Sequence, residues 1–197
     1  MVVLAALAGA MAAPFPATAQ GKTESGEFLK AVRDRDGDKA TELLDRPGTV
    51  VVNTREFTSG TTALHIVTER RDLTWLSFLL NRGANPNVRD KAGVTPLEIA
   101  SNLGWNDGVQ KLIDEGAEVD SRNEVGATPL IAAVHRRDLP LIRILLKAGA
   151  DPDRTDYSGR SARNYADQIA SPALVEVIAE ASQEQAARRA NTYGPGA

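Results

Sequence analysis

Apolar residues recur along the middle of this chain with the three- and four-residue spacing of a helix that buries one face. The clearest stripe appears three times at intervals of 33 residues, as Leu76, Leu79 and Leu80; Val109, Leu112 and Ile113; and Ile142, Leu145 and Leu146. Each stripe predicts a helix packed against its neighbours. The pair Leu43-Leu44 precedes Leu79-Leu80 by 36 residues, so we expect three extra residues between positions 47 and 59, at a hairpin tip.

Polar and small residues predict a shorter helix ahead of each stripe. The same opening recurs in step, as Thr62-Ala63-Leu64-His65, Thr95-Pro96-Leu97-Glu98, Thr128-Pro129-Leu130-Ile131 and Ser161-Ala162-Arg163-Asn164. A Thr or Ser hydroxyl accepts unpaired N–H groups of the first turn, and proline lacks only an N–H that the first turn leaves unused. A glycine precedes each opening by two residues, and Gly83, Gly116 and Gly149 end the second helices.

These phrases resemble the ankyrin repeat, in which about 33 residues form a turn and two helices. The resemblance implies an all-α, ankyrin-repeat solenoid of about five helix-turn-helix units joined by β-hairpin turns. The units fall at about residues 27–60, 61–93, 94–126, 127–159 and 160–181. Arg163 replaces the usual leucine in the last unit, which suits a terminal cap with one side in solvent. His65 occupies the family position at which the ring bridges backbone groups, so we expect a structural role for it.

The two ends differ from the repeats. Residues 1–19 combine an apolar, alanine-rich run with the small-residue pattern Ala17-Thr18-Ala19, and they predict a cleaved signal peptide with Gln20 as the first mature residue. The run lacks a basic start and is shorter than the roughly 20 residues that span a bilayer. We expect a short flexible lead at 20–26, a disordered tail at 182–197, and a periplasmic protein without membrane insertion. The alternative is a disordered leader on a cytosolic protein.

Composition argues against several kinds of chemistry. The chain has no cysteine, which excludes disulfides and thiolate ligands, and its net charge of −3 argues against nucleic acid as a partner. Asp34, Asp36 and Asp38 have the spacing that opens a calcium loop, but Lys39 stands where that loop needs glycine. No catalytic or nucleotide-binding motif occurs, so we expect no enzyme activity, no cofactor and no metal site. Carboxylates that folding brings together remain open.

The ankyrin family binds other proteins through a concave face lined by hairpin tips and first helices, so the resemblance implies candidate partner-binding residues. Tyr157 is the foremost, because an exposed aromatic ring on a rigid turn buries much area at little entropy cost. Phe57 stands where the family has a fingertip aspartate, and it either meets a partner or folds back over the first hairpin. The full set is Phe57, Lys91, Glu124 and Tyr157 at the tips, and Arg70, Leu103, His135 and Arg136 on the first helices.

Two arginine pairs, Arg70-Arg71 and Arg136-Arg137, lie at equivalent positions two units apart, either as a basic spot or as solvated turns. The whole pattern favours a non-catalytic, monomeric module that binds and stabilises, inhibits or neutralises another extracytoplasmic protein. An envelope-associated scaffold is the alternative, and an unrecognised hydrolase is less favoured. The partner stays unidentified, because specificity rests on a few side chains on a generic frame.

Overall fold

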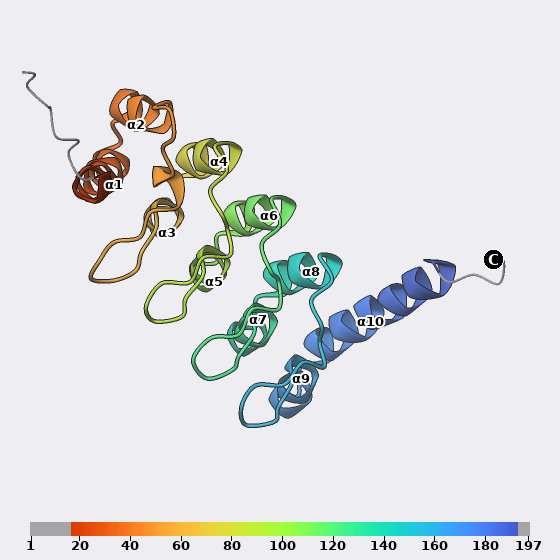
Figure 1. The fold of residues 1–197 in the computed structure, drawn as a ribbon. Coiled ribbons are helices and arrows are strands. Elements are labelled where there is room, and N and C mark those ends of the chain that lie inside the picture. Colours follow the sequence, from red (N-terminus) through yellow and green to blue (C-terminus); the bar gives the residue numbers. More distant parts are fainter. Residues whose placement is uncertain (1–16, 193–197) are drawn as a thin grey trace, which may run out of the picture.

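The computed structural model describes residues 17–192, which form pairs of short antiparallel helices and one longer helix at the end (Figure 1). The helices in chain order are α1 (Ala17–Asp34), α2 (Gly37–Leu44), the 3₁₀ turn η1 (Val51–Asn53), α3 (Ala63–Glu69), α4 (Leu73–Asn81), α5 (Pro96–Asn102), α6 (Asn106–Asp114), α7 (Pro129–Arg136), α8 (Leu139–Lys147), α9 (Ala162–Ile169) and α10 (Pro172–Thr192).

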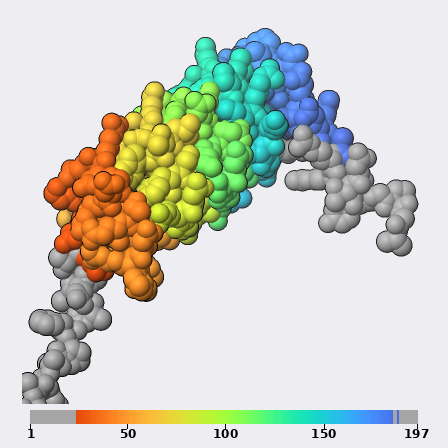
Figure 2. Space-filling model, turned by 90° about the horizontal axis from the view of Figure 1, so that it is seen from above, coloured from red at the N-terminus to blue at the C-terminus, as the bar shows by residue number. Residues whose placement is uncertain are grey.

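The helices form two rows, with a loop projecting from the first row between successive units (Figure 1). The first helices α1, α3, α5, α7 and α9 pack on one another in order, and so do α4, α6, α8 and α10 in the second row. The units follow one another along a single elongated body (Figure 2). This arrangement confirms the all-α solenoid of about five units. Within the described residues, no strand is formed, and the loops contribute one isolated bridge between Thr155 and Ser161.

The predicted caps start the helices as the sequence indicates. The Thr95 and Thr128 hydroxyls accept the Glu98 and Ile131 N–H groups at 3.2 and 3.3 Å, with proline at the following position. Asp72 and Asp138 cap α4 and α8 in the same way. Each cap satisfies backbone donors that a helix start leaves unpaired, so the opening phrase fixes where each helix begins.

The core is continuous because every unit contributes the same buried side chains. Leu79, Leu112 and Leu145 are fully buried on the inner side of the second row, and Ala100 and Ala133 allow the first helices to approach closely. Burying one leucine stabilises the fold by roughly 1.5–3 kcal/mol. A lone helical hairpin could not bury these faces, so the units stabilise one another through their interfaces.

His65 holds two units together, as its position predicts. Its Nδ1 accepts the Thr62 N–H at 3.2 Å, so the proton sits on Nε2, which donates to the Val94 carbonyl of the next loop at 3.0 Å. The ring is fully buried, and burial lowers the pKa of His65 because it disfavours the imidazolium form. A charged ring would also lose the acceptor that Thr62 requires.

A row of amide and carboxylate side chains forms a second link between units. Asn87 Nδ2 donates to the Gly116 carbonyl at 3.0 Å, and its Oδ1 accepts the Glu118 N–H at 2.8 Å. Asn53 makes the same two bonds one unit earlier, donating to the Gly83 carbonyl and accepting the Asn85 N–H. Asp120 occupies the next position in the row and accepts the Asp151 N–H at 3.1 Å. A carboxylate has no proton to donate, so this third link has only the accepting half.

The three extra residues of the first unit are divided between two places. Compared with the second unit, two of them lie between Leu44 and Asn53, where η1 forms, and one lies in the following loop. In that loop the Gly60 N–H reaches back to Glu56, four residues away, whereas Gly93 reaches back three residues to Asp90. The prediction that all three would enlarge the hairpin tip is therefore wrong for two of them.

Both ends are more helical than predicted. The expected flexible lead at 20–26 belongs to α1, which begins at Ala17 and is anchored by the buried Phe28 and Val32. The first part of the expected disordered tail belongs to α10, which continues to Thr192 because residues 182–192 are rich in alanine and long polar helix formers. Most of the predicted signal peptide (residues 1–16) and residues 193–197 lie outside the described residues.

Candidate functional site

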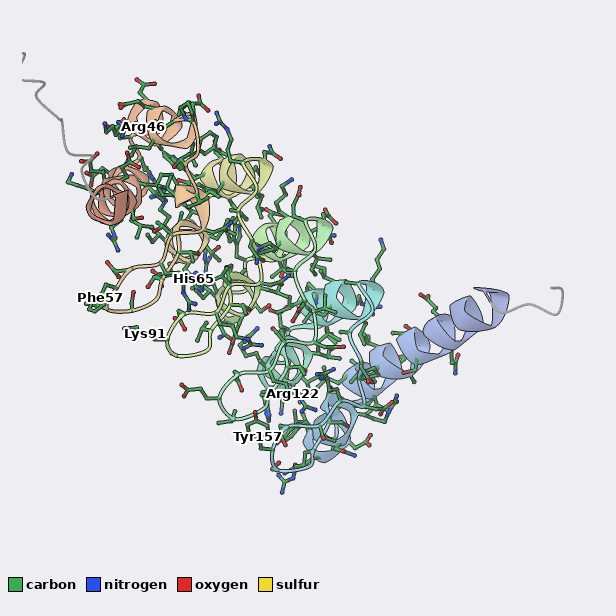
Figure 3. The ribbon with its side chains drawn as sticks, in the orientation of Figure 1. Arg46, Phe57, His65, Lys91, Arg122 and Tyr157 are labelled. Carbon is green, nitrogen blue, oxygen red and sulfur yellow. The ribbon has the colours of Figure 1, made fainter. Side chains whose placement is uncertain are left out.

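The loops between units, here called fingers 1 to 4, project from the row of first helices (Figure 1). The finger tips are residues 56–60, 90–93, 123–126 and 156–159. We call the side of the protein formed by the fingers and the first helices the concave face, after the family's binding face. Phe57, Lys91 and Tyr157 stand out at the tips of fingers 1, 2 and 4 (Figure 3). The structure therefore places the predicted fingertip candidates along one edge of one surface.

An acidic or amide side chain shapes the tips of fingers 2 to 4. Asp90 Oδ1 accepts the Ala92 and Val94 N–H groups at 2.9 Å each, and Asn123 and Asp156 bind equivalent backbone groups. In finger 1 the corresponding residue is Glu56, whose carboxylate accepts the Ser59 hydroxyl at 2.6 Å. The alignment of Phe57 with the fingertip aspartate is therefore wrong by one residue, because the extra residue of this loop lies after Glu56.

Arginine side chains tie the bases of the first three fingers together. Arg55 donates from Nε to the Gly60 carbonyl at 3.3 Å within its own finger and from its guanidinium to the Arg89 carbonyl of finger 2. Arg89 repeats the arrangement, since its Nη1 lies 2.7 Å from both the Gly93 and the Arg122 carbonyl oxygens. These bonds hold the finger bases at a fixed spacing, and the sequence analysis did not single out these arginines.

The tips, unlike the bases, are bonded in two pairs. The Lys91 N–H donates to Ser59 O at 2.8 Å between fingers 1 and 2, and the Tyr157 N–H donates to Val125 O at 3.2 Å between fingers 3 and 4. Within residues 17–192, no backbone bond joins the tips of fingers 2 and 3. The glycines agree with this: a Cβ at Gly126 would lie 2.7 Å from Tyr157 N, whereas one at Gly93 would meet nothing within 4 Å.

Phe57 does not fold back over the first hairpin. The residue is 91% exposed, and Lys91 Nζ lies 5.3 Å from the centroid of its ring. Lys91 Nζ also donates to the Phe57 carbonyl at 2.6 Å. An exposed phenylalanine gains nothing from the core, so the structure leaves this ring available at the tip of finger 1.

A depression lies between fingers 3 and 4 and the first helices beneath them, and we call it the aromatic depression. Its sides include His135 on α7 and Tyr165 on α9, whose rings lie 4.2 Å apart between centroids with a tilt of 56°. Tyr157 and Val125 stand above it with 71% and 65% of their side chains exposed. The complete lining is Glu124, Val125, Ala127, Ile131, Ala132, His135, Asp156, Tyr157, Ser158 and Tyr165.

Asp156 organises one wall of this depression. Its Oδ2 accepts the Tyr165 hydroxyl at 2.7 Å, and its Oδ1 accepts the Ser158 hydroxyl and N–H at 2.7 and 2.8 Å. Hydrogen bonds from Ser158 and then Tyr165 hold the pKa of Asp156 far below its usual range. The group is therefore ionised across the physiological pH range, and it fixes the orientation of the Tyr165 ring.

Two of the predicted contact residues, Arg70 and Arg136, also link neighbouring units of the stack. Arg70 donates to the Val32 carbonyl near the end of α1 at 2.5 Å. Its guanidinium carbon lies over the Trp75 ring, 5.4 Å from the centroid. Arg136 donates in the same way to the Ser101 carbonyl near the end of α5 at 2.6 Å. Both arginines satisfy carbonyls that a helix end leaves unpaired. Both arginines therefore join adjacent first helices, and their expected part in partner binding stays a prediction.

Leu103 and the second arginine of the first pair have similar positions. Leu103 caps the end of α5, and its carbonyl accepts Arg71 Nη2 from the preceding unit at 2.6 Å. The side chain of Leu103 is only partly exposed. The sequence left open whether the two arginine pairs form a basic spot or solvated turns. Neither alternative describes them fully, because three of the four arginines bind carbonyls of neighbouring first helices.

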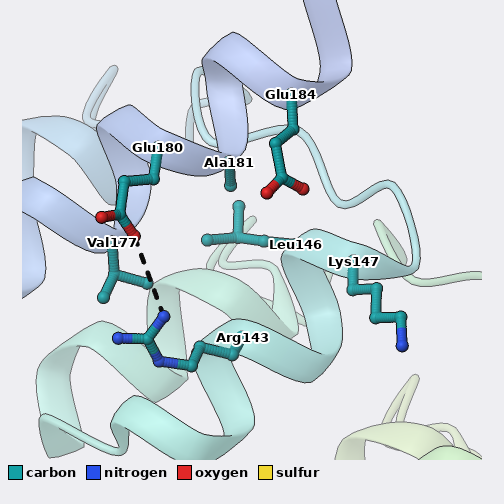
Figure 4. A pocket seen from close by; sticks show the side chains of 7 residues that line it. All are labelled: Arg143, Leu146, Lys147, Val177, Glu180, Ala181 and Glu184. Atoms are coloured by element: carbon teal, nitrogen blue, oxygen red, sulfur yellow. Dashed lines mark ion pairs between the residues drawn. The ribbon is translucent and has the colours of Figure 1, made fainter. Parts of the chain in front are cut away.

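A second depression lies away from the concave face, where α10 packs on α8 (Figure 4). It is lined by the buried Leu146 and Val177, and Arg143 Nη1 and Glu180 Oε2 are 3.9 Å apart across it. Its lining consists of apolar core residues and solvent-exposed charges. Among the described residues that line it there is no aromatic ring, unlike in the aromatic depression.

Metal-ligating clusters and membrane-spanning helices are both absent from the described residues. They hold no group of three or more His, Asp or Glu side chains that could bind a metal ion, and Cys is absent from the chain. None of the helices formed by residues 17–192 has the length and apolarity that a bilayer crossing requires.

Sequence reasoning named some of the residues that line the aromatic depression and missed others. Tyr157, Glu124 and His135 were predicted, whereas Tyr165 and Asp156 were not. The 33-residue register contains the signal, because Tyr165 repeats the position of Ile66, Ile99 and Ala132 on the concave side of the first helices. At this repeated position the other units have an aliphatic or small residue, so an aromatic ring there indicates a site.

Comparison with known proteins finds the same repeat. The family model for ankyrin repeats (three copies) matches residues 28–123 and again residues 100–187. The chain is 33% identical over 127 residues to human transient receptor potential cation channel subfamily A member 1, covering 64% of this chain and 11% of the channel. It is 38% identical over 72 residues to mouse ankyrin repeat domain-containing protein 9, covering 36% of this chain and 21% of that protein.

A further relative is the human 2-5A-dependent ribonuclease, which is 32% identical over 93 residues, or 45% of this chain and 12% of the ribonuclease. The chain thus spans about a fifth or less of the length of each of these relatives. The similarity in each case concerns stacked repeats, and it leaves most of the relative unmatched.

Proposed function

Because the chain belongs to the ankyrin repeat family, we propose that it binds and stabilises, inhibits or neutralises another protein through its concave face. Ankyrin repeats are protein–protein interaction modules, and their fold is typically non-catalytic. The observation that supports this proposal is the set of large apolar side chains held in solvent at the finger tips, above all Phe57 and Tyr157. Rings in these positions add nothing to the core and resemble interface anchors.

We further propose that the partner is extracytoplasmic. The support comes from the sequence of residues 1–19, with its apolar run and small-residue cleavage pattern. The absence of cysteine throughout the chain is compatible with an oxidising compartment, because no thiol is available for unwanted pairing. On this proposal the mature protein is a monomeric periplasmic module.

Site-specific photo-cross-linking tests the binding face. One variant carries a benzophenone amino acid in place of Tyr157, and the control carries it in place of Val175, an exposed apolar residue on α10. Each is mixed with a periplasmic extract and irradiated, and adducts are identified by mass spectrometry. We expect a discrete protein adduct from position 157 and none from position 175. Adducts from position 175 alone, or from neither position, would refute binding through the concave face.

A further inference from the structure

The aromatic depression differs chemically from the rest of the concave face. Its lining combines the rings of His135, Tyr157 and Tyr165 with two carboxylates, Glu124 and Asp156, and contains no lysine or arginine. The lining also includes the apolar side chains of Val125, Ala127, Ile131 and Ala132, so a bound group would displace water from apolar surface. The face of an aromatic ring carries partial negative charge and a carboxylate carries full negative charge, so together they attract cations.

Neither carboxylate is neutralised by an ion pair. Among the described residues, no lysine or arginine nitrogen lies within 4.0 Å of a Glu124 or Asp156 carboxylate oxygen. Arg136 binds the Ser101 carbonyl, and the Arg160 guanidinium lies over the Tyr165 ring, 5.9 Å from its centroid, without being part of the lining. The depression therefore presents negative charge to an incoming group.

The rings are held in place before any partner arrives. Tyr165 is fixed by its 2.7 Å hydrogen bond to Asp156 and by contact with the His135 ring. Tyr157 is fixed by its backbone bond to Val125 and by close packing over Gly126. A preformed site loses little conformational entropy on binding, so even one side chain can gain useful affinity from it.

We propose that the aromatic depression receives an arginine side chain of the protein partner. A guanidinium is planar, stacks on aromatic faces and binds carboxylates with two parallel N–H groups, so it matches this lining better than a compact ammonium. The proposal rests on the proposed function, since it identifies what the concave face recognises. It predicts an exposed arginine, flanked by apolar residues, in the bound segment of the partner.

The test uses the full chain and a defined probe, the blocked peptide acetyl-Ala-Leu-Arg-Leu-Ala-amide. Its control replaces arginine with citrulline, which keeps the shape and removes the charge. NMR titration should move the ring signals of His135, Tyr157 and Tyr165, with at least fivefold weaker binding for the citrulline peptide. Glu124→Gln should weaken arginine binding at least threefold, and the matched variant Glu176→Gln on α10 should not change it. A lysine peptide should bind more weakly than the arginine peptide.

Several results would overturn the assignment: no shifts at millimolar arginine peptide, equal binding of the citrulline peptide, equal or tighter binding of the lysine peptide, or no effect of Glu124→Gln. The cross-linking experiment separates this failure from failure of the proposed function. If position 157 captures a partner whose cross-linked segment lacks arginine, concave-face binding stands and the arginine assignment fails. If position 157 captures nothing, the proposed function fails, whatever the peptide does.

Discussion

Replacing Asp120 with asparagine should stabilise the protein. Asn87 ties its unit to the next by one accepted and one donated hydrogen bond, and Asp120 keeps only the accepted bond, from the Asp151 N–H at 3.1 Å. The Gly149 carbonyl corresponds in register to the one that Asn87 binds. Asparagine at position 120 retains an acceptor for Asp151 and supplies an N–H for Gly149, so it completes the interface between the last two full units.

The expected gain follows from this one bond and from the charge that is removed. A typical intramolecular hydrogen bond contributes about 1 kcal/mol to the free energy of unfolding. Burial raises the pKa of Asp120, which means that the folded protein disfavours this carboxylate, and the nearby charge of Asp151 acts in the same direction. For a domain of this size, about 1 kcal/mol corresponds to a rise in Tm of roughly 2–4 °C.

Thermal unfolding of the full chain, followed by circular dichroism at pH 7 and pH 3, measures this gain. Because the folded-state pKa of Asp120 is raised, its protonated form stabilises the fold at low pH, and this contribution is lost as pH rises through that pKa. The protonated carboxyl can donate a hydrogen bond as asparagine does, so the advantage of Asp120→Asn should be larger at pH 7 than at pH 3.

The reverse variant, Asn87→Asp, removes the donated bond from the preceding interface and should lower the Tm at pH 7 by a similar amount. The reasoning is refuted if Asp120→Asn leaves the Tm at pH 7 unchanged or lower while Asn87→Asp destabilises as expected. An advantage that is equal at pH 3 and pH 7 would refute the part played by the charge.

Three further predictions concern the histidine link, the finger tips and the arginine bonds. The pKa of His65 is lowered in the fold, so stability should fall as pH drops from 7 towards 5.5, and His65→Gln should flatten this dependence in urea unfolding curves. Gly126→Ala should destabilise the protein more than Gly93→Ala and should shift the Tyr157 NMR signals, because both glycines have positive φ but only a Cβ at 126 meets a neighbour; equal costs would contradict the paired tips. Arg136→Ala should lower the free energy of unfolding by about 1 kcal/mol in the same urea experiment, whereas a pure contact residue would leave it unchanged.

The sequence predicted the repeated parts of the fold well, because the same local signals occur in every unit. Thr95 and Thr128 cap helices where their phrase indicates, and the aliphatic stripe through Leu79 is buried in each unit. The sequence-based alignment was wrong where the first unit departs from the 33-residue period. The extra residue after Glu56 means that Glu56, and not Phe57, shapes the tip of finger 1. Counting three residues back from Gly60 aligns Phe57 with Asp90. Such a count cannot show whether the extra residue lies before or after the residue that shapes the tip.

The candidate site was predicted less completely, for a different reason. Tyr157 and His135 were named because their slots face outward in the family. Arg70 and Arg136 occupy outward slots too, but their long side chains reach back to carbonyls of the preceding unit. A residue's place on a helix does not determine where a long side chain ends. The floor under Tyr157 depends on packing between two units, which no local pattern encodes.

The pairing of the finger tips has a mechanical consequence. Fingers 1 and 2 form one block, joined at the tips by a backbone hydrogen bond, and fingers 3 and 4 form another in the same way, while the bases beneath them remain joined through Arg89 and the Arg122 carbonyl. The block edges can therefore separate or close without breaking a backbone hydrogen bond between tips. A ligand that contacts Phe57 and Tyr157 together would bind both blocks and would fix the distance between them.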